Sequence, residues 1–249
     1  MLLASSVLLC SLLVACNKQQ NPRTATPSNT ANQETTNINN SSTQEQNPSG
    51  GIASVFPKSD LTDSIVIDSV NEDQAIRAEQ QTDKGTLLMI SNGKEERGHL
   101  NVSSTLGQEG DQTFQSNYSI IYRQGDQDKV LLELPAYLFV QPSDKKLTLE
   151  KVSFKDADVY ILTPQYQTGH GLEGYVFAID KQSGDVFALE IVKKDRVSKT
   201  ILYSESEPLL SIENDGLVVH PPVGAGTPEE DAKDVVYKLD LSKKQLVAE

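Results

Sequence analysis

From residue 52 to its C-terminus the chain is a series of short β-type runs, separated by turns that contain Gly, Asp, Pro and Lys. Apolar and polar residues alternate within strands, whereas a helix places apolar residues three and four positions apart. The helical spacing is nearly absent, so the sequence predicts an all-β domain over residues 51–249. Residues 71–81 are the exception, because Ala75, Ile76 and Ala78 are compatible with a short helix.

An internal repeat adds a second constraint on the fold. Residues 159–164 match residues 217–222, and these two segments start 58 positions apart (217 − 159). Each is followed by a polar loop and a hairpin, at residues 175–190 and 235–249. A weaker third copy comprises residues 87–90, 118–122 and 130–134, and the strands expected between copies are 137–141, 147–154, 200–204 and 209–213. Each unit therefore has about four antiparallel strands, and the last unit lacks its final strand. Residues 52–70 could supply that strand or part of a fourth unit.

One hairpin of this repeat indicates an architecture. Residues 175–186 run from an aromatic residue through Ala178 and Asp180 to a turn at Ser183 and Gly184. This hairpin resembles the repeat of quinoprotein-type β-propellers, without the Trp of that repeat. The resemblance implies a propeller-like array of about three four-stranded units, and it implies no cofactor. A β-sandwich is the alternative, because strand–turn–strand patterns look alike in any antiparallel protein.

The N-terminus has the features of a lipoprotein signal peptide. Residues 2–15 carry no charge, and their apolar run is shorter than the roughly 20 residues that span a bilayer. The run ends in Leu13-Val14-Ala15-Cys16, which resembles a bacterial lipobox. The resemblance implies removal of residues 1–15, attachment of diacylglycerol to the Cys16 thiol, and a mature Cys16 that carries palmitate-type acyl chains.

Two further features bear on this assignment. No basic residue precedes Lys18, so either the α-amino group alone supplies the positive charge or the true start lies elsewhere. Asn17 follows the Cys where Asp would commonly retain a lipoprotein at the inner membrane, which favours an outer membrane, facing the periplasm, if the organism is Gram-negative. The alternative reading of this segment is a buried apolar stretch with an ordinary core Cys.

A polar tether is expected between this anchor and the β domain. Residues 17–50 consist mainly of Asn, Gln, Thr, Ser and Pro, and with Cys16 they form the predicted linker 16–50. Such a composition cannot bury enough apolar surface to offset the entropy of ordering, so it predicts disorder. A flexible chain of this length has a root-mean-square reach of roughly 30 Å.

The net charge of −13 argues against nucleic acid as a partner, because phosphate backbones are bound by clusters of Lys and Arg. The adjacent basic pairs, at residues 145–146, 193–194 and 243–244, lie in or beside expected turns and are interpreted as solvated. No G-x-S-x-G motif occurs, and lipidation of Cys16 would leave no free thiol for catalysis.

Three histidines are the candidates for a metal site. His99, His170 and His220 each fall in or beside the loop after the first strand of a repeat copy, so a genuine repeat would bring them to one end of the domain. Three imidazoles could hold zinc or copper. Their spacing matches no metal motif, however, and solvated loop histidines are the favoured interpretation. The acidic cluster at residues 229–231 and Asp234 is likewise interpreted as aiding solubility rather than binding Ca²⁺.

The sequence thus favours a non-enzymatic envelope lipoprotein that presents loops to an envelope protein or another envelope partner. The loops expected to differ between units are 91–117, 165–174 and 223–233, and recognition usually resides in loops on a rigid scaffold. Two alternatives stay open: an envelope hydrolase that uses carboxylates on the same face, and a sensor or carrier for a small ligand or metal.

Overall fold

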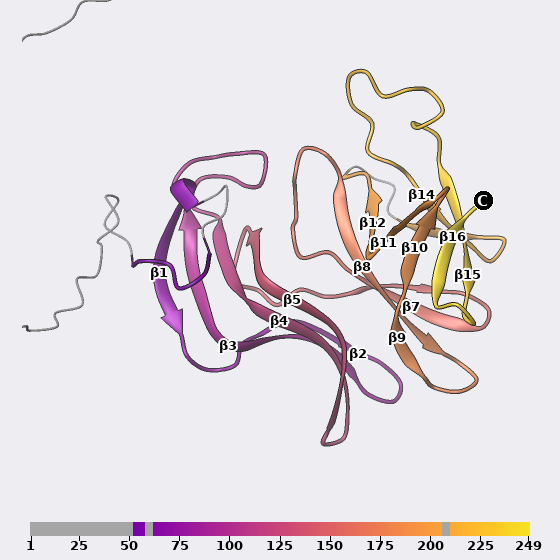
Figure 1. The fold of residues 1–249 in the computed structure, drawn as a ribbon, viewed down its shortest axis with the longest axis horizontal. Coiled ribbons are helices and arrows are strands. Elements are labelled where there is room, and N and C mark those ends of the chain that lie inside the picture. The colour runs from indigo at the N-terminus through magenta and orange to yellow at the C-terminus, as the bar shows by residue number, and fades with distance from the viewer. Residues whose placement is uncertain (1–51, 58–61, 206–209) are drawn as a thin grey trace, which may run out of the picture. The chain divides into compact units, whose positions relative to one another are not determined.

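The computed structural model describes residues 52–57, 62–205 and 210–249. Within these ranges the chain forms sixteen strands and one short 3-10 helix, η1 (Thr62–Ser64), which confirms the all-β prediction for this part of the chain. The predicted signal peptide, Cys16 and the predicted tether lie outside the described residues. The strands form three sheets, here called the first, middle and last sheet (Figure 1).

The first sheet is an antiparallel meander of long strands. Its strands are β1 (Ile65–Asn71), β2 (Ile76–Gln81), β3 (Thr86–Leu100), β4 (Gln112–Gln124) and β5 (Gln127–Gln141). β3 is long enough for β1 and β2 to pair with it one after the other, β2 along residues 86–90 and β1 along residues 95–100. Between these halves the register of β3 against β4 shifts, and Gly93 has a left-handed φ of 97°. A bulge of this kind bends the strand and re-aims its side chains.

The middle and last sheets contain the two closest copies of the repeat. The middle sheet holds β6 (Glu150–Ser153), β7 (Ala157–Leu162), β8 (Leu172–Asp180), β9 (Val186–Ala188) and β12 (Thr200–Tyr203). The last sheet holds β10 (Glu190–Lys193), β11 (Arg196–Ser198), β13 (Ser211–Glu213), β14 (Gly216–Val219), β15 (Val235–Asp240) and β16 (Gln245–Ala248). The strands β6 to β9 and β13 to β16 are each an antiparallel meander of four strands, as the repeat predicts.

The structure also shows how the last sheet is completed. β10 leaves the middle unit and pairs in parallel with β16, and β11 then pairs with β10. The added strands of the last sheet therefore come from residues 190–198, whereas β1 joins the first sheet and does not extend the last one. The sheets are open, with a distinct strand at each end of the pairing order.

Two sequence-based expectations were wrong. Residues 76–81 form strand β2 rather than a helix, because pairing with β3 in the sheet overrides a weak local preference. The expected loop 91–117 is mostly strand, since β3 continues to Leu100 and β4 begins at Gln112. The polar residues around Gly93 look like a turn in the sequence but form the bulge within β3.

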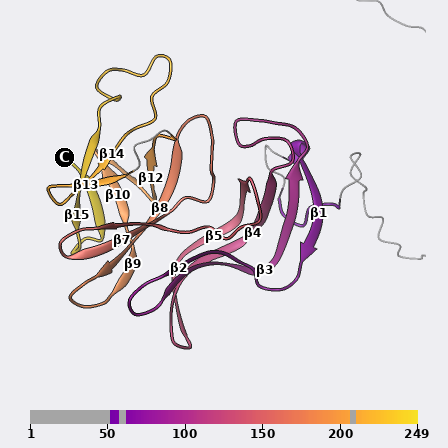
Figure 2. The ribbon, with the colours of Figure 1, turned by 180° about the vertical axis from the view of Figure 1, so that it is seen from behind.

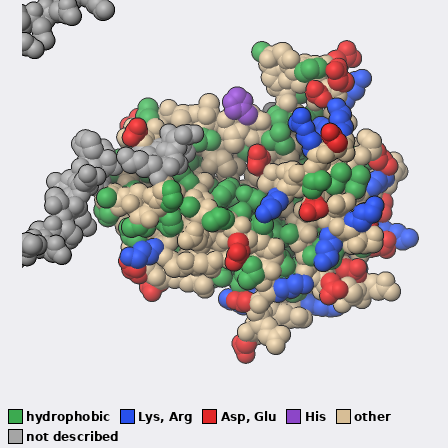
Figure 3. Space-filling view, in the orientation of Figure 1, with side chains coloured by type: hydrophobic (Ala, Val, Ile, Leu, Met, Phe, Trp, Pro, Cys, Tyr) green, Lys and Arg blue, Asp and Glu red, His purple; other side chains and the backbone are tan. Residues whose placement is uncertain are grey.

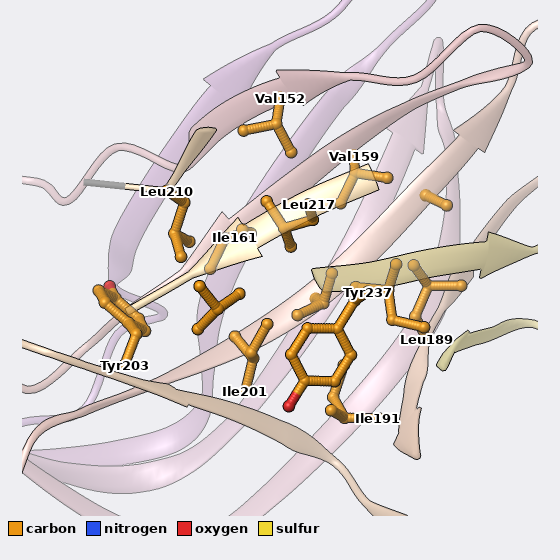
Figure 4. Close-up of a cluster of buried hydrophobic side chains, with 14 of the residues drawn as sticks. Val152, Val159, Ile161, Leu189, Ile191, Ile201, Tyr203, Leu210, Leu217 and Tyr237 are labelled. Carbon is orange, nitrogen blue, oxygen red and sulfur yellow. The ribbon is translucent and has the colours of Figure 1, made fainter. Parts of the chain in front are cut away.

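The two largest core clusters lie on the two faces of the middle sheet, and a smaller cluster of Leu88, Ile90 and Ile121 belongs to the first sheet. β7 shows this directly: Val159 and Ile161 pack towards the last sheet, while Tyr160 and Leu162 pack towards the first sheet. Figure 4 shows the cluster between the middle and last sheets, and Figure 2 shows the strands from behind. Burial of each such large apolar side chain contributes about 1.5–3 kcal/mol. The middle sheet is thus covered on both faces, which explains the nearly continuous apolar sequence of β7.

Candidate functional site

Three loops, one from each sheet, meet at the same end of the strands. Loop 1 (residues 101–111) connects β3 to β4, loop 2 (residues 163–171) connects β7 to β8, and loop 3 (residues 220–234) connects β14 to β15. Figure 1 shows all three at the top of the view. We call their combined surface the loop face. Its formation agrees with the expectation that equivalent loops of a repeat emerge together.

Side chains of loop 2 fasten it to loop 1. The Gln165 amide nitrogen donates to the carbonyl oxygen of Leu106 at 2.6 Å, and the Gln165 amide oxygen accepts from the backbone N–H of Val140 in β5 at 2.9 Å. The Tyr166 hydroxyl donates to the carboxylate of Asp111. Burial, the first cause, and this carboxylate both raise the pKa of the Tyr166 hydroxyl, so it stays protonated and donates. Loops 1 and 2 are therefore held as one surface.

Loop 2 also approaches loop 3 closely. Gly171 has a left-handed φ of 98°, and a Cβ atom at this position would lie 2.7 Å from Cγ of Pro222 and 2.8 Å from the carbonyl oxygen of Tyr203. Only glycine fits both the conformation and the space. The backbone N–H of Ser204 donates to the carbonyl oxygen of His220 at 2.7 Å, which joins the end of β12 to the start of loop 3.

The tip of loop 2 is held by a carboxylate that no sequence motif singles out. One oxygen of Glu205 accepts from the backbone N–H groups of Thr168 at 2.6 Å and Gly169 at 2.8 Å. Burial raises the pKa of the Glu205 carboxyl, but these hydrogen bonds lower it further, so the pKa lies below its usual value. The ionised carboxylate therefore orders a loop whose tip, Gly169 and His170, is exposed to solvent.

The three histidines lie near this end of the domain but have separate partners. His99, inside β3 rather than in a loop, has Nδ1 2.8 Å from a carboxylate oxygen of Asp68. His220 at the start of loop 3 has Nδ1 2.5 Å from a carboxylate oxygen of Asp234, the last residue of the loop. His170 is exposed at the tip of loop 2, and Figure 3 shows a His side chain on the loop side of the molecule.

The described residues contain no group of three or more His, Cys, Asp or Glu placed to hold a metal ion. His99 and His220 instead contact single carboxylates. The contact between His220 and Asp234 closes the base of loop 3, and the contact between His99 and Asp68 joins β3 to β1.

The two buried carboxylates of the described residues do not converge in a pocket. The buried carboxylates in the described ranges are Glu95 and Glu96, neighbours in β3. Successive residues of a strand point to opposite faces. Glu95 pairs with Arg77 and Arg97, while Glu96 accepts from the Ser54 hydroxyl and the Val55 backbone N–H. The exposed acidic residues Glu229, Glu230 and Asp231 project from loop 3.

A buried ionic network lies beneath the bulge of β3. The Arg77 guanidinium in β2 donates to Glu95 through Nε at 2.7 Å and also through a terminal nitrogen, and the Tyr118 hydroxyl donates to the same carboxylate at 2.7 Å. Arg77 lies 4.0 Å from the ring centroid of Phe114. Burial raises the pKa of Glu95, but the hydrogen bonds from Arg77, Tyr118 and Arg97 lower it further, so the carboxyl is ionised at neutral pH. This network joins β2, β3 and β4.

A cavity of about 230 Å³ lies at the opposite end of the strands. It is lined by Tyr122, Gln124, Gln127, Asp128, Lys129, Gly184, Asp185 and Val186, from the β4–β5 and β8–β9 turns. Ligand pockets typically enclose about 300–1,000 Å³ and are mostly apolar. This cavity is smaller and is lined mainly by polar residues, so the loop face is the stronger candidate.

No family model, no curated protein and no solved structure matches the chain. No helix within the described ranges is long and apolar enough to cross a membrane.

Proposed function

We propose that the chain is a bacterial envelope lipoprotein whose β domain binds an envelope partner through the loop face. Residues 1–15 would act as the signal peptide, Cys16 would carry the lipid, and residues 17–50 would tether the domain. The support for the anchor is the sequence Leu13-Val14-Ala15-Cys16 after a short uncharged apolar run. An outer membrane, with the domain facing the periplasm, is the proposed site in a Gram-negative organism.

The observation that supports a binding role is the joining of loops from three sheets into one surface. Gln165, Tyr166 and Gly171 fix loop 2 against its neighbours, and the core beneath the loops is buried on both faces of the middle sheet. A surface built on fixed elements loses little entropy on binding. Exposed residues such as His170 and Val223 then offer polar and apolar contacts to a partner.

We further propose that the three sheets are propeller-like units. Support comes from the four-stranded meanders β6–β9 and β13–β16 and from the loops that leave the same end of each sheet. The exchange of β10 and β11 into the last sheet also suits an array in which a strand of one unit completes the next. A sandwich of stacked sheets is the competing description.

Site-specific photocrosslinking in intact envelopes tests the binding role. A crosslinking residue at Val223 or His170 probes the loop face, and one at Asp126 or Lys243 probes turns at the other end of the strands. The proposal predicts that the same adduct forms from both loop positions and from neither turn. The variant Gln165→Ala should weaken that adduct, because it frees loop 2 from Leu106 and Val140.

Two results would contradict the proposal. Equal adducts from the loop and turn positions would mean that crosslinking reports only proximity. A purified chain that hydrolyses sugar or ester substrates, and loses this activity on substitution of Glu205 or Asp111, would move the function to catalysis.

A further inference from the structure

The β10–β11 hairpin concentrates positive charge in an acidic protein. Residues 193–199 include Lys193, Lys194, Arg196 and Lys199 against one acidic residue, Asp195, which gives +3 (four cations minus one anion). The whole chain carries −13, so the remainder carries −16 (−13 − 3). The hairpin is thus opposite in sign to the rest of the molecule. We call residues 193–199 the basic hairpin.

These cations have no side-chain partner among the described residues. Elsewhere in those ranges many Lys and Arg are paired, for example Arg123 with Asp128 at 2.7 Å and Lys151 with Asp158 at 2.7 Å. In the basic hairpin no ion pair or hydrogen bond engages a side-chain nitrogen, and residues 194–199 are all exposed. Folding therefore leaves four neighbouring charges available to a ligand.

The fold holds the basic hairpin at the edge of the last sheet. β10 pairs with β16, and β11 pairs with β10 as the final strand in the pairing order. Figure 1 shows β10 beside the C-terminal strand β16. Val197 lies between the cations and is 60% exposed. In Figure 3 most of the Lys and Arg side chains in view lie on the side of these later strands. A surface with anionic groups outside and an apolar layer beneath would be contacted by both residue types, with the cations at the anionic groups and the exposed apolar side chain in the apolar layer.

We propose that the basic hairpin docks on the anionic phospholipid surface of the membrane. Near such a surface each Lys or Arg contributes about 1 kcal/mol, or about a fivefold change in binding. Screening over about 8–10 Å limits the opposing effect of distant carboxylates. The same charge separation orients the domain, because the hairpin is attracted to the lipid phosphates and the rest of the molecule is repelled.

The choice of a bilayer as the partner rests on the proposed function, because a lipid anchor keeps a membrane within tether range. Docking then becomes an intramolecular step, so contacts that bind a free protein only weakly suffice to hold the tethered domain on the bilayer. A nucleic acid is the other large polyanion with suitable phosphates, and it lacks both this proximity and an apolar layer for Val197. Binding to a nucleic acid instead of vesicles is one of the outcomes that would overturn the proposal.

Vesicle cosedimentation of the full-length chain with Cys16→Ser, which cannot be lipidated, tests the docking by comparing vesicles and variants that all share the apolar residues 1–15. The proposal predicts binding to equimolar phosphatidylglycerol and phosphatidylcholine, loss of that binding in high salt, and little binding to phosphatidylcholine alone. The variant Arg196→Gln/Lys199→Gln should lower the partition coefficient roughly 25-fold, from about fivefold per cation.

A matched control removes exposed cations from other parts of the described structure. Lys84→Gln/Lys145→Gln changes the net charge by the same amount as the hairpin variant and should leave vesicle binding within about twofold. Thermal unfolding of each variant confirms that the fold is intact. Equal losses in the two variants, no preference for anionic vesicles, or binding to a single-stranded oligonucleotide without vesicle binding would each overturn the proposal. Acyl labelling of the wild type is a separate measurement, so an absent lipid with intact vesicle docking would refute the anchor and leave the hairpin inference standing.

Discussion

Removal of the Glu95 carboxylate should destabilise the domain more than any exposed charge change. The Glu95 side chain is fully buried, and Arg77, its main partner, has a side chain only 7% exposed. Glu95→Ala would leave the Arg77 guanidinium buried without a counterion, and the Tyr118 hydroxyl without its acceptor. Breaking a buried pair in this way costs about 3–5 kcal/mol. That is a large fraction of the roughly 5–15 kcal/mol that stabilises an ordinary domain.

Urea unfolding of the full-length chain, followed by circular dichroism, measures this loss. Arg97→Gln is the matched control, because Arg97 contacts the same carboxylate at 3.1 Å with a side chain 41% exposed. An exposed pair contributes about 1 kcal/mol or less. The triple variant Arg77→Met, Glu95→Leu and Tyr118→Phe should recover most of the stability, since it leaves no buried polar group unpaired and Arg97 remains solvated. A Glu95→Ala variant that unfolds with the same free energy as Arg97→Gln would show that the buried pair stabilises the domain no more than the exposed contact does.

The pH dependence of stability has a definite sign in this network. The pKa of Glu95 lies below its usual value in the folded state, so its contribution is fully present above the unfolded pKa of about 4.3. The contribution is lost as the pH falls through the lower, folded pKa. Acid titration should therefore destabilise the wild type more than the triple variant. The reverse order would mean that the carboxyl is protonated in the folded domain.

Two further predictions concern the loop face. Gly171→Ala should destabilise the domain by about 1–3 kcal/mol, because the left-handed φ and the contacts at 2.7–2.8 Å leave no room for a Cβ atom. Gly224→Ala is the control and should be nearly neutral, since a Cβ atom there would have no atom within 4 Å. Thermal unfolding compares the two variants, and equal effects would contradict the close packing of loops 2 and 3. Glu205→Gln should speed hydrogen exchange at the backbone amides of Thr168 and Gly169, because both amides donate to this carboxylate. In the wild type, the same amides should lose protection as the pH falls through the lowered pKa of Glu205, once the measured rates are corrected for intrinsic exchange. Unchanged protection in either experiment would show that the carboxylate does not order the loop.

The strands of the repeat could be predicted because their local pattern agrees with their place in the fold. Residues 235–240 and 245–248 alternate and end at turns, so β15 and β16 match expectation. The predictions for β2 and for the second half of β3 were wrong, because pairing with strands distant in the sequence determines the conformation of these residues. Arg77 and Glu95 look like surface charges in the sequence, and only the pairing of β2 with β3 makes them a buried ion pair.

The candidate site was predictable in outline only. The repeat placed three loops at one end, but no sequence pattern shows that Gln165 spans from Leu106 to Val140. Glu205 lies 36 residues from Gly169 along the chain, and nothing local connects the two. The histidines were chosen for their chemistry, whereas their partners, Asp68 and Asp234, depend on strand register and loop closure.

Metabolic labelling with an alkynyl fatty acid measures whether Cys16 carries a lipid, on which the function proposed for the domain depends. We expect that the wild-type chain made in its own cells takes up the label and that its mature N-terminus begins at the modified Cys16. Cys16→Ser should take up none. A wild-type chain that incorporates no acyl probe, or that keeps its first fifteen residues, would contradict the account.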